Sequence, residues 1–343
     1  MRDTSHEEQK NVNPVIGISI GDINGIGPEV AIKALADNRI LKLLTPVIYA
    51  DGKLISYYRK QLKIQNFNYN QTNSIDKIHH GKINVINLNS TNFEVNPGNP
   101  NMEGGEYAIN SLRSSVSDLK EGKIQGLVTA PISKEHSQSE DFQFPGHTEY
   151  LTKEDGAKDS LMFLVTENLR IGVATGHISI KDVPEALTAE RIESKLKIMI
   201  KSLKKDFGIK KPRVAVLGLN PHAGENGLLG DEEIKVIEPV IKSFKEKGNL
   251  VFGPFPADGF FGTFQFKSFD GILAMYHDQG LVPFKNMAFD SGVNYTAGLS
   301  FVRVSPDHGT GFQIAGKNCA NEESMRNAIF LTADIIKNRI GNQ

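Results

Sequence analysis

Short apolar runs alternate with longer stretches of helical spacing from Pro14 to the end of the chain. Brief apolar runs rich in Val and Ile are typical of buried strands, whereas apolar positions that recur every three or four residues are typical of helices. This alternation predicts an α/β fold built around a mostly parallel sheet. The first four runs that indicate strands are residues 14–20, 45–51, 82–88 and 126–131.

Local end signals place two of the helices. The turn GDINGIG follows the first strand and leads to Pro28, and proline is favoured at the first position of a helix. A second helix is predicted within residues 188–208, with Thr188 as its N-cap and Gly208 as its stop. Its apolar stripe consists of Ile192, Leu196, Met199 and Leu203.

Two segments depart from the regular alternation. The apolar runs 160–167 and 169–176 are separated only by Asn168, so they are expected to turn back on each other as a hairpin. Residues 89–105 are rich in Asn, Gly and Pro and predict a long surface loop.

Length and composition narrow the class of protein. A chain of 343 residues exceeds the usual size of a single core, so we expect two lobes with a cleft between them. The 39 Lys and Arg residues balance the 40 Asp and Glu residues, which favours a small-molecule substrate and argues against a nucleic-acid or membrane partner.

Cysteine usage and the start of the chain restrict the setting. Cys319 is the only cysteine, which excludes an intramolecular disulfide and a cysteine-rich metal site. The first 13 residues are polar and predict a frayed tail, and no apolar run is long enough for a membrane span. We therefore expect a cytoplasmic protein.

Three histidines follow three apolar runs: His177 after IGVATG, His222 after VAVLGLNP and His277 after ILAMY. Ligands of open α/β sheets bind where strands end, and imidazole is a common ligand of catalytic divalent metals. The pattern predicts one metal site assembled from distant segments. The alternative is that each histidine caps a strand or forms hydrogen bonds in a loop.

Other polar residues suit an anionic ligand. The turn GDINGIG is not a dinucleotide fingerprint and is either a tight turn or a binding loop. His147, Thr148 and Glu149 form a compact set of donors and an acid, or else a helix cap. The planar fork of Arg303 suits a carboxylate or phosphate. Further candidates in the last third of the chain are Asp278, Lys285, Asn294, Asp307, His308, Thr310 and Lys317.

Together these motifs resemble the 4-hydroxythreonine-4-phosphate dehydrogenase family of vitamin B6 biosynthesis. The resemblance rests on GHTEYL, ATGH, LNPHAGE, AMYHDQGL, GVN and VRVSPDHGTG, in this order from about Pro14 to the C-terminus. GDINGIGPE and DHGTGFQIAGK are similar to segments of the wider isocitrate and isopropylmalate dehydrogenase superfamily, which binds NAD without a Rossmann domain.

The resemblance implies two α/β/α lobes with a cleft between them, a fold that is not of the Rossmann type. The implied nucleotide-binding lobe is discontinuous and comprises residues 14–135 and 286–343. The implied lobe for metal, substrate and dimerisation is residues 136–285. The enzyme would be a homodimer whose active site is shared between subunits.

The family's site residues carry over to this chain by position. The implied metal ligands are His177, His222 and His277. The implied substrate contacts are His147, Thr148, Lys285, Asn294 and Arg303. The implied nicotinamide-nucleotide contacts are Asp307, His308, Gly309 and Thr310. The proton acceptor is left open among Lys285, Asp258 and a metal-bound hydroxide. The residues after Asp258 depart from the family's commonest pattern, which leaves the local wall of the substrate site open.

The implied reaction is oxidation of 4-phosphooxy-L-threonine at C3 by NAD or NADP with one divalent metal, Zn, Co or Mg, per site. Decarboxylation to 3-amino-2-oxopropyl phosphate follows, in the biosynthesis of pyridoxal 5'-phosphate. Relatives that act on 4-phospho-D-threonate, 4-phospho-D-erythronate or cyclic diol carboxylates are alternatives. A metal-dependent aldolase or isomerase in a β/α barrel is an alternative of another class, against which the hairpin at Asn168 argues. A non-catalytic binding protein is the third alternative.

Overall fold

A single sheet runs through the computed structural model, which describes residues 13–90, 93–139, 141–144 and 146–341. In these residues the strand order is β3-β4-β2-β1-β5-β12-β11-β6-β7-β10-β8-β9. The strands are β1 Val15–Ser19, β2 Thr45–Tyr49, β3 Tyr69–Thr72, β4 Ile83–Ile86, β5 Gly126–Thr129, β6 Leu161–Val165, β7 Arg170–Val173, β8 Arg213–Leu217, β9 Leu250–Phe255, β10 Gly271–Ala274, β11 Val293–Ala297 and β12 Val302–Pro306. The predicted α/β class is confirmed.

Helices cover both faces of this sheet. The α-helices are α1 Gly27–Leu35, α2 Gly52–Gln61, α3 Met102–Lys120, α4 His147–Asp155, α5 Val183–Ala186, α6 Ala189–Lys205, α7 Glu238–Glu246, α8 Ala257–Gly262, α9 His277–Ala288 and α10 Glu323–Gly341. Shorter helical turns are η1 Asn38–Lys42, η2 Ile75–Lys77, η3 Ile180–Asp182, η4 Pro221–Gly227, η5 Glu233–Ile237 and η6 Gln265–Ser268. No helix of the described residues is both long and apolar enough to cross a membrane.

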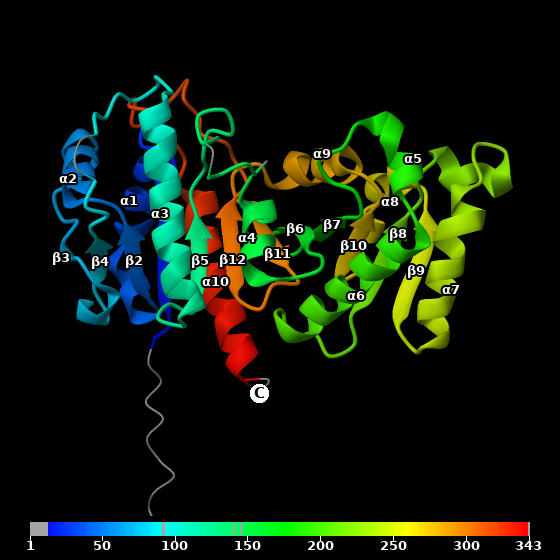
Figure 1. Ribbon diagram of the computed structural model, residues 1–343. Coiled ribbons are helices and arrows are strands. Elements are labelled where there is room, and N and C mark those ends of the chain that lie inside the picture. Colours follow the sequence, from blue (N-terminus) through cyan, green and yellow to red (C-terminus); the bar gives the residue numbers. More distant parts are fainter. Residues whose placement is uncertain (1–12, 91–92, 140, 145, 342–343) are drawn as a thin grey trace, which may run out of the picture.

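Antiparallel strands occupy the middle of an otherwise parallel sheet. β11 is antiparallel to both β12 and β6, and β6 is antiparallel to β7. The predicted hairpin is confirmed, because Phe163 pairs with Gly172 and the amide of Thr166 donates to the carbonyl of Leu169 at 2.8 Å. Strands β11 and β12 come late in the chain yet lie between β5 and β6, so the C-terminal part returns to the centre of the sheet (Figure 1).

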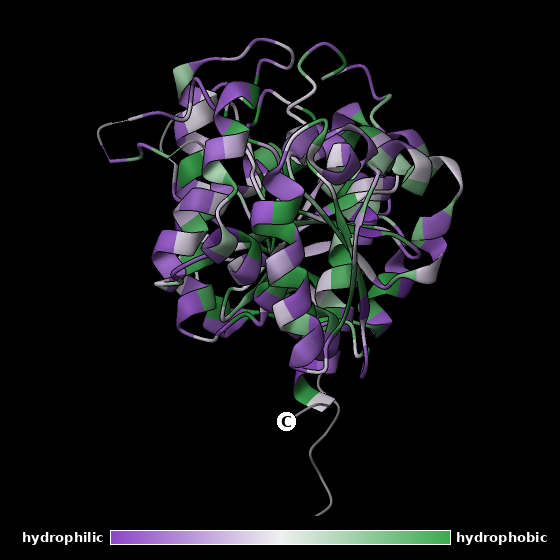
Figure 2. Ribbon diagram, turned by 90° about the vertical axis from the view of Figure 1, so that its right-hand side faces the viewer, coloured by the Kyte–Doolittle hydropathy of each residue, from purple (hydrophilic) through white to green (hydrophobic). Residues whose placement is uncertain are grey.

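The core follows from strand alternation, because successive side chains of a strand point to opposite faces. On one face, α3 and α4 pack on β1, β2 and β5. Farther along, α8 and α9 pack on β7, β8 and β10. On the other face, α1, α2, α6, α7 and α10 share a continuous core. Hydrophobic residues accordingly concentrate on the interior strands (Figure 2). The two-lobe division at the boundaries given above stays a prediction.

Local signals placed most helix ends correctly. Pro28 lies in the first turn of α1, and the Thr188 side chain accepts a hydrogen bond from the amide of Arg191, as an N-cap does. The predicted stop at Gly208 is confirmed, because α6 ends at Lys205 and Gly208 follows with a left-handed φ of 70°, while the amide of Ile209 donates to the carbonyl of Leu203 at 2.9 Å. Residues 1–12 of the predicted tail lie outside the described residues.

The predicted surface loop 89–105 is too long at its C-terminal end. Helix α3 already begins at Met102, because the Asn101 side chain accepts a hydrogen bond from the amide of Gly104 at 2.8 Å and caps the helix. Gly104 and Gly105 are buried in the first turn of α3, where Gly104 packs on the side chains of Asp22 and Asn24 and Gly105 on the backbone of residues 136–137. Glycine there serves close packing and does not mark a loop.

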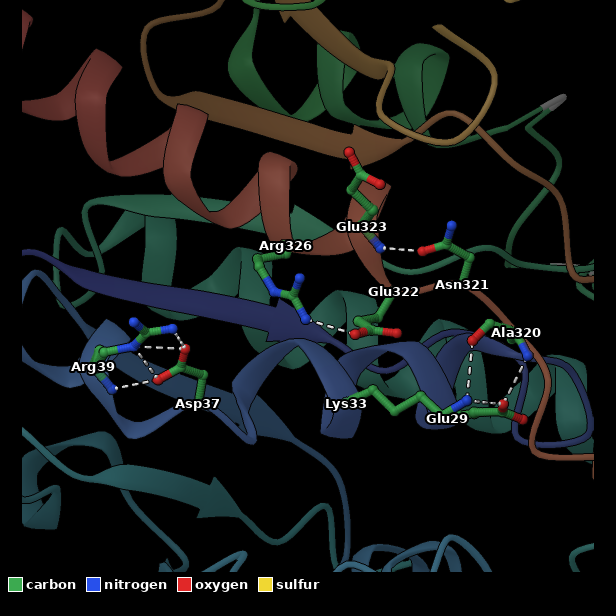
Figure 3. A network of polar contacts seen from close by, with 9 residues as sticks. All are labelled: Glu29, Lys33, Asp37, Arg39, Ala320, Asn321, Glu322, Glu323 and Arg326. Atoms are coloured by element: carbon green, nitrogen blue, oxygen red, sulfur yellow. Dashed lines mark hydrogen bonds and ion pairs between the residues drawn. The ribbon is translucent and has the colours of Figure 1, made fainter.

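A buried carboxylate joins the start of the chain to its end. Glu29 of α1 is 1% exposed and accepts hydrogen bonds from the amide of Ala320 at 2.9 Å and from Lys33 at 2.7 Å. Lys33 also donates to the carbonyl of Ala320 at 3.0 Å (Figure 3). This closed set of contacts fixes the segment before α10 against α1.

A second buried network surrounds Asp206. Its carboxylate accepts hydrogen bonds from Tyr295 at 2.6 Å, Ser202 at 2.7 Å and Arg339 at 2.7 Å. Asp206 and Arg339 are 4% and 12% exposed at their side chains, so water screens the pair little. The network ties α6 and β11 to α10.

We expect Asp206→Ala to lower the free energy of unfolding by about 3–5 kcal/mol, because it leaves the Arg339 guanidinium buried without its carboxylate. Urea denaturation measures this change. Lys197→Ala is the control, since it breaks an exposed ion pair with Glu193 and should change the free energy by less than about 1 kcal/mol. Equal effects of the two substitutions would show that the Asp206 network contributes no more than a surface pair.

Candidate active site

A pocket of about 340 Å³ lies on one face of the sheet where β5, β12, β11 and β6 meet. Alternation places Arg303 and Ser305 of β12 on that face, and Asn294 of β11 joins them because it pairs with Ser305. The pocket is closed by the start of α4 and by α9. It therefore draws its lining from both halves of the chain.

Arg303 forms the floor of the pocket. It is only 3% exposed, and its guanidinium donates to Thr129 at 2.6 and 3.1 Å and to Thr296 at 2.9 Å. Burial lowers the pKa of Arg303 to about 10, and the nearby Glu149 carboxylate opposes that shift. Arg303 thus stays cationic at neutral pH, held in place by neutral hydroxyls.

His147 opens α4 and faces Arg303. Burial lowers the pKa of His147 well below its ordinary value, and the charge of Arg303 adds to that effect. Among the described residues, neither Nε2 of His147 nor Oδ1 of Asn294 has a hydrogen-bond partner, although both atoms are buried. Buried polar atoms are nearly always hydrogen-bonded, so these two are available to a ligand. Thr148 lies beside them, with Oγ1 3.5 Å from the Arg303 guanidinium.

Lys285 of α9 brings a second cation to the pocket. Its Nζ lies 2.9 Å from the Asp307 carboxylate and donates to the Asp307 carbonyl at 3.1 Å. Asp307, predicted as a nucleotide contact, therefore also holds Lys285. Arg303 and Lys285 give the pocket two cationic groups, which favours an anionic ligand.

His177 and His277 lie together at the edge of the pocket. They follow β7 and β10, which are parallel neighbours, and their ring centroids are 5.4 Å apart. The Nδ1 atom of His277 is 2.6 Å from the Asp278 carboxylate, which leaves Nε2 for another partner, as in many metal-bound histidines. Burial lowers the pKa of His177, with Lys134 as the next largest cause, and this favours the neutral ring that a metal requires.

His222 lies in a different setting, in the exposed turn η4 after β8. Residues 222–226 all have positive φ angles, and four of them are not glycine. Left-handed backbone costs roughly 1–2 kcal/mol per residue other than glycine, so this turn is strained. Within the described part of the chain, no three His, Cys, Asp or Glu side chains are close enough to hold a metal ion. His222 thus does not complete a three-ligand group with His177 and His277 in one chain.

The remaining predicted residues divide between the pocket and the surface. His308 and Gly309 line the pocket, and the Thr310 carbonyl accepts a hydrogen bond from the amide of Ile26 at 2.8 Å. The turn GDINGIG and the segment around Thr310 are therefore in contact. In the described chain Asp258 is exposed on α8, Lys317 is also exposed, and neither lines the pocket.

Sequence reasoning missed the two threonines that hold Arg303. Thr129 ends β5 and Thr296 lies in β11, so both appeared as ordinary strand residues. Alternation within β12 and β11 was the available signal, since it shows which side chains share a face with Arg303. Using that signal requires knowing that β12 pairs with both β5 and β11.

Known proteins resemble most of the chain. A family model described as pyridoxal phosphate biosynthetic protein PdxA matches residues 42–332. A 4-hydroxythreonine-4-phosphate dehydrogenase of Bacteroides thetaiotaomicron is 46% identical over 325 residues, which cover 94% of this chain and 89% of that protein. An Oceanobacillus iheyensis relative named "Putative D-threonate 4-phosphate dehydrogenase" is 36% identical, with 92% and 96% coverage. The crystal structure of a 4-hydroxythreonine-4-phosphate dehydrogenase from Klebsiella pneumoniae superposes with a TM-score of 0.81 at 34% identity, covering 96% of this chain and 99% of that one.

The depressed pKa of His147 makes stability depend on pH. The unfolded chain binds a proton near the ordinary histidine pKa of 6.5, whereas folded His147 resists protonation until a lower pH. Stability is therefore lost as the pH falls below about 6.5, by up to about 1.4 kcal/mol per pH unit from this group. We expect His147→Gln to have a shallower decline in urea-unfolding free energy between about pH 7 and pH 5, in chelator-containing buffer.

The control for this measurement is His80→Gln, because His80 is exposed and does not line the pocket. It should follow the wild-type curve. If His147→Gln also follows the wild-type curve, the folded protein does not keep His147 neutral.

Proposed function

The chain belongs to the PdxA family, and on that premise we propose that it oxidises 4-phosphooxy-L-threonine at C3 with NAD or NADP and a divalent metal. Decarboxylation to 3-amino-2-oxopropyl phosphate completes the reaction. The observation that carries the proposal is the buried Arg303 guanidinium in the same pocket as the pair His177 and His277. An anion site and a pair of potential metal ligands are what a phosphorylated hydroxy acid requires.

The anionic groups of the substrate would bind at the floor of the pocket. Arg303 and Lys285 supply positive charge, and Thr148 and Asn294 supply neutral donors. His147 is neutral, so one of its ring nitrogens can donate and the other can accept. These groups would hold the phosphate and carboxylate and leave the C3 hydroxyl directed toward the histidines.

The proposed metal ligands are His177, His222 and His277. Two of the three fit that role in one chain, since their rings are adjacent and Asp278 orients His277. A bound divalent ion, Zn, Co or Mg, would supply polarisation of the alcohol oxygen. His222 would join from a loop that has left-handed backbone.

Lys285 is the proposed proton acceptor. Of the two residue candidates, Lys285 lines the described pocket, whereas Asp258 is exposed on α8. Lys285 is cationic when the substrate binds, so it would have to release its own proton to solvent before it takes the proton of the alcohol. The Asp307 carboxylate at 2.9 Å would then stabilise the ammonium that forms again.

Asp307, His308, Gly309 and Thr310 are the proposed contacts of NAD or NADP. They follow β12 directly, and the Thr310 carbonyl lies against the amide of Ile26 in the GDINGIG turn. Backbone amides at that turn lead into the N-terminus of α1, which suits an anionic nucleotide. We assign this role to the lobe formed by residues 14–135 and 286–343, and the metal and dimer contacts to residues 136–285.

A homodimer with a shared site is part of the proposal. Exposed apolar side chains occur on the segments after the histidine strands and on or just after α9, and such side chains are candidates for a subunit interface. Two of these side chains, Leu228 and Leu229, directly follow the turn that carries His222, so this segment could contact a second subunit. These exposed residues are Ile178, Ile180, Leu228, Leu229, Ile234, Val282 and Phe289.

Oxidation of 4-phospho-D-threonate or 4-phospho-D-erythronate is the second candidate function. The Oceanobacillus relative carries the first of these names at 36% identity. The same anion pocket and histidines would serve either substrate, since both carry a phosphate and a carboxylate.

We expect the purified protein to reduce NAD or NADP with 4-phosphooxy-L-threonine, and to lose this activity in chelator. Absorbance of the reduced nicotinamide measures turnover. Arg303→Lys should lower kcat/KM by about 10-fold or more, because lysine cannot keep the threonine hydrogen bonds and the planar fork together. Faster turnover of phospho-threonate or phospho-erythronate would favour the second function, and no reduction with any of the three would refute both.

Alanine substitution of each proposed ligand tests the metal assignment. We expect His177→Ala, His222→Ala and His277→Ala each to lower both bound metal and turnover, because a two-histidine site binds divalent ions weakly. Metal content per chain after dialysis gives the stoichiometry. A variant that keeps full metal and full turnover is not a ligand variant, and His80→Ala serves as the exposed control.

A further inference from the structure

The turn that carries His222 rests on one buried carboxylate, that of Glu233. Its Oε1 atom accepts hydrogen bonds from the backbone amides of Leu219 at 2.7 Å and Asn220 at 2.8 Å. Glu233 is 1% exposed. The carboxylate therefore fixes the two residues that lead from β8 into the turn.

The Asn220 side chain extends this anchor. Its Nδ2 atom donates to Oε2 of Glu233 at 2.9 Å and to Oε2 of Glu232 at 2.7 Å. The backbone carbonyl of Asn220 accepts a hydrogen bond from the amide of Ala223 at 3.1 Å, and Ala223 is the residue after His222. Glu233 thus holds the residues just before His222 directly. It holds Ala223, the residue just after His222, indirectly, because Asn220 bonds to both Glu233 and Ala223.

Two glycines show how closely the turn packs on these groups. Gly224 has φ +82°, and a Cβ there would lie 2.7 Å from Oε2 of Glu233. Gly230 has φ +134°, and a Cβ there would lie 2.3 Å from Nδ2 of Asn220. Any larger side chain would displace the carboxylate or the amide, so the turn is built around them.

We infer that Glu233 is a positioning residue for His222. Left-handed backbone at His222, Ala223, Glu225 and Asn226 is unfavourable by itself and persists only where the surroundings impose it. The three hydrogen bonds of the Glu233 carboxylate go to Leu219 and Asn220, the residues just before that segment, so Glu233 sets the direction in which His222 leaves β8. The inference rests on the proposed function, because it takes His222 to be a metal ligand.

The test compares metal affinity in the full-length protein after chelator treatment, with Co²⁺ alone as the probe and calorimetry as the readout. We expect Glu233→Ala to weaken Co²⁺ binding by about 10- to 100-fold, as loss of a partner that orients a ligand typically does. Glu233→Gln should weaken it less, since the amide oxygen can still accept the two backbone hydrogen bonds. Glu238→Gln, an exposed acid at the start of α7, should leave the affinity unchanged.

Turnover as a function of Co²⁺ separates positioning from a general loss of structure. In Glu233→Gln the rate at saturating Co²⁺ should approach the wild-type rate, with the half-saturating concentration raised. A damaged fold would lower the saturating rate without such recovery. If Glu233→Ala does not fold, Glu233→Gln decides the question by the same two measurements.

His222→Ala distinguishes failure of this inference from failure of the proposed function. If His222→Ala weakens Co²⁺ binding while both Glu233 variants bind like the wild type, Glu233 does not position His222 and the ligand assignment stands. If His222→Ala binds Co²⁺ as tightly as the wild type, the ligand assignment itself is wrong, and the role of Glu233 fails with it.

Discussion

A guanidinium buried on the face of a sheet must find its hydrogen-bond acceptors inside the protein, because water does not reach it. Arg303 finds them in Thr129 of β5 and Thr296 of β11. Both acceptors are neutral hydroxyls, so the charge of Arg303 is oriented without being cancelled. An anionic ligand then meets a cation whose position is already fixed, and little ordering is needed when it binds.

The unusual middle of the sheet follows from this requirement. Thr129 and Thr296 flank Arg303 only because β12 lies between β5 and β11. That order requires the chain to return from its C-terminal third to the strands of its first half. The same return brings α9 next to the end of β12, where Lys285 of α9 forms an ion pair with Asp307. The antiparallel strands thus join the two halves of the chain and shape the anion pocket at once.

Local sequence signals predicted the helices and strands better than the long-range contacts between their side chains. Proline at the start of α1, the threonine cap of α6 and the hairpin at Asn168 depend on neighbouring residues, and the structure confirms them. The contact between Arg303 and Thr129 spans 174 residues, so no local pattern reports it. The left-handed turn at His222 was hidden for a similar reason, since its conformation depends on hydrogen bonds to Glu233, beyond the turn.

The anion pocket and the turn that carries His222 differ in what holds them in place. In the pocket, Arg303 lies on a strand and its guanidinium is fixed by buried hydrogen bonds to Thr129 and Thr296. His222, in contrast, lies on an exposed turn whose backbone is unfavourable without external contacts. Such a turn can move once its anchoring contacts change, while β7 and β10 keep His177 and His277 in place. On the proposed assignment, affinity for the anionic part of a substrate depends on the sheet, and assembly of the three histidines around a metal depends on the turn.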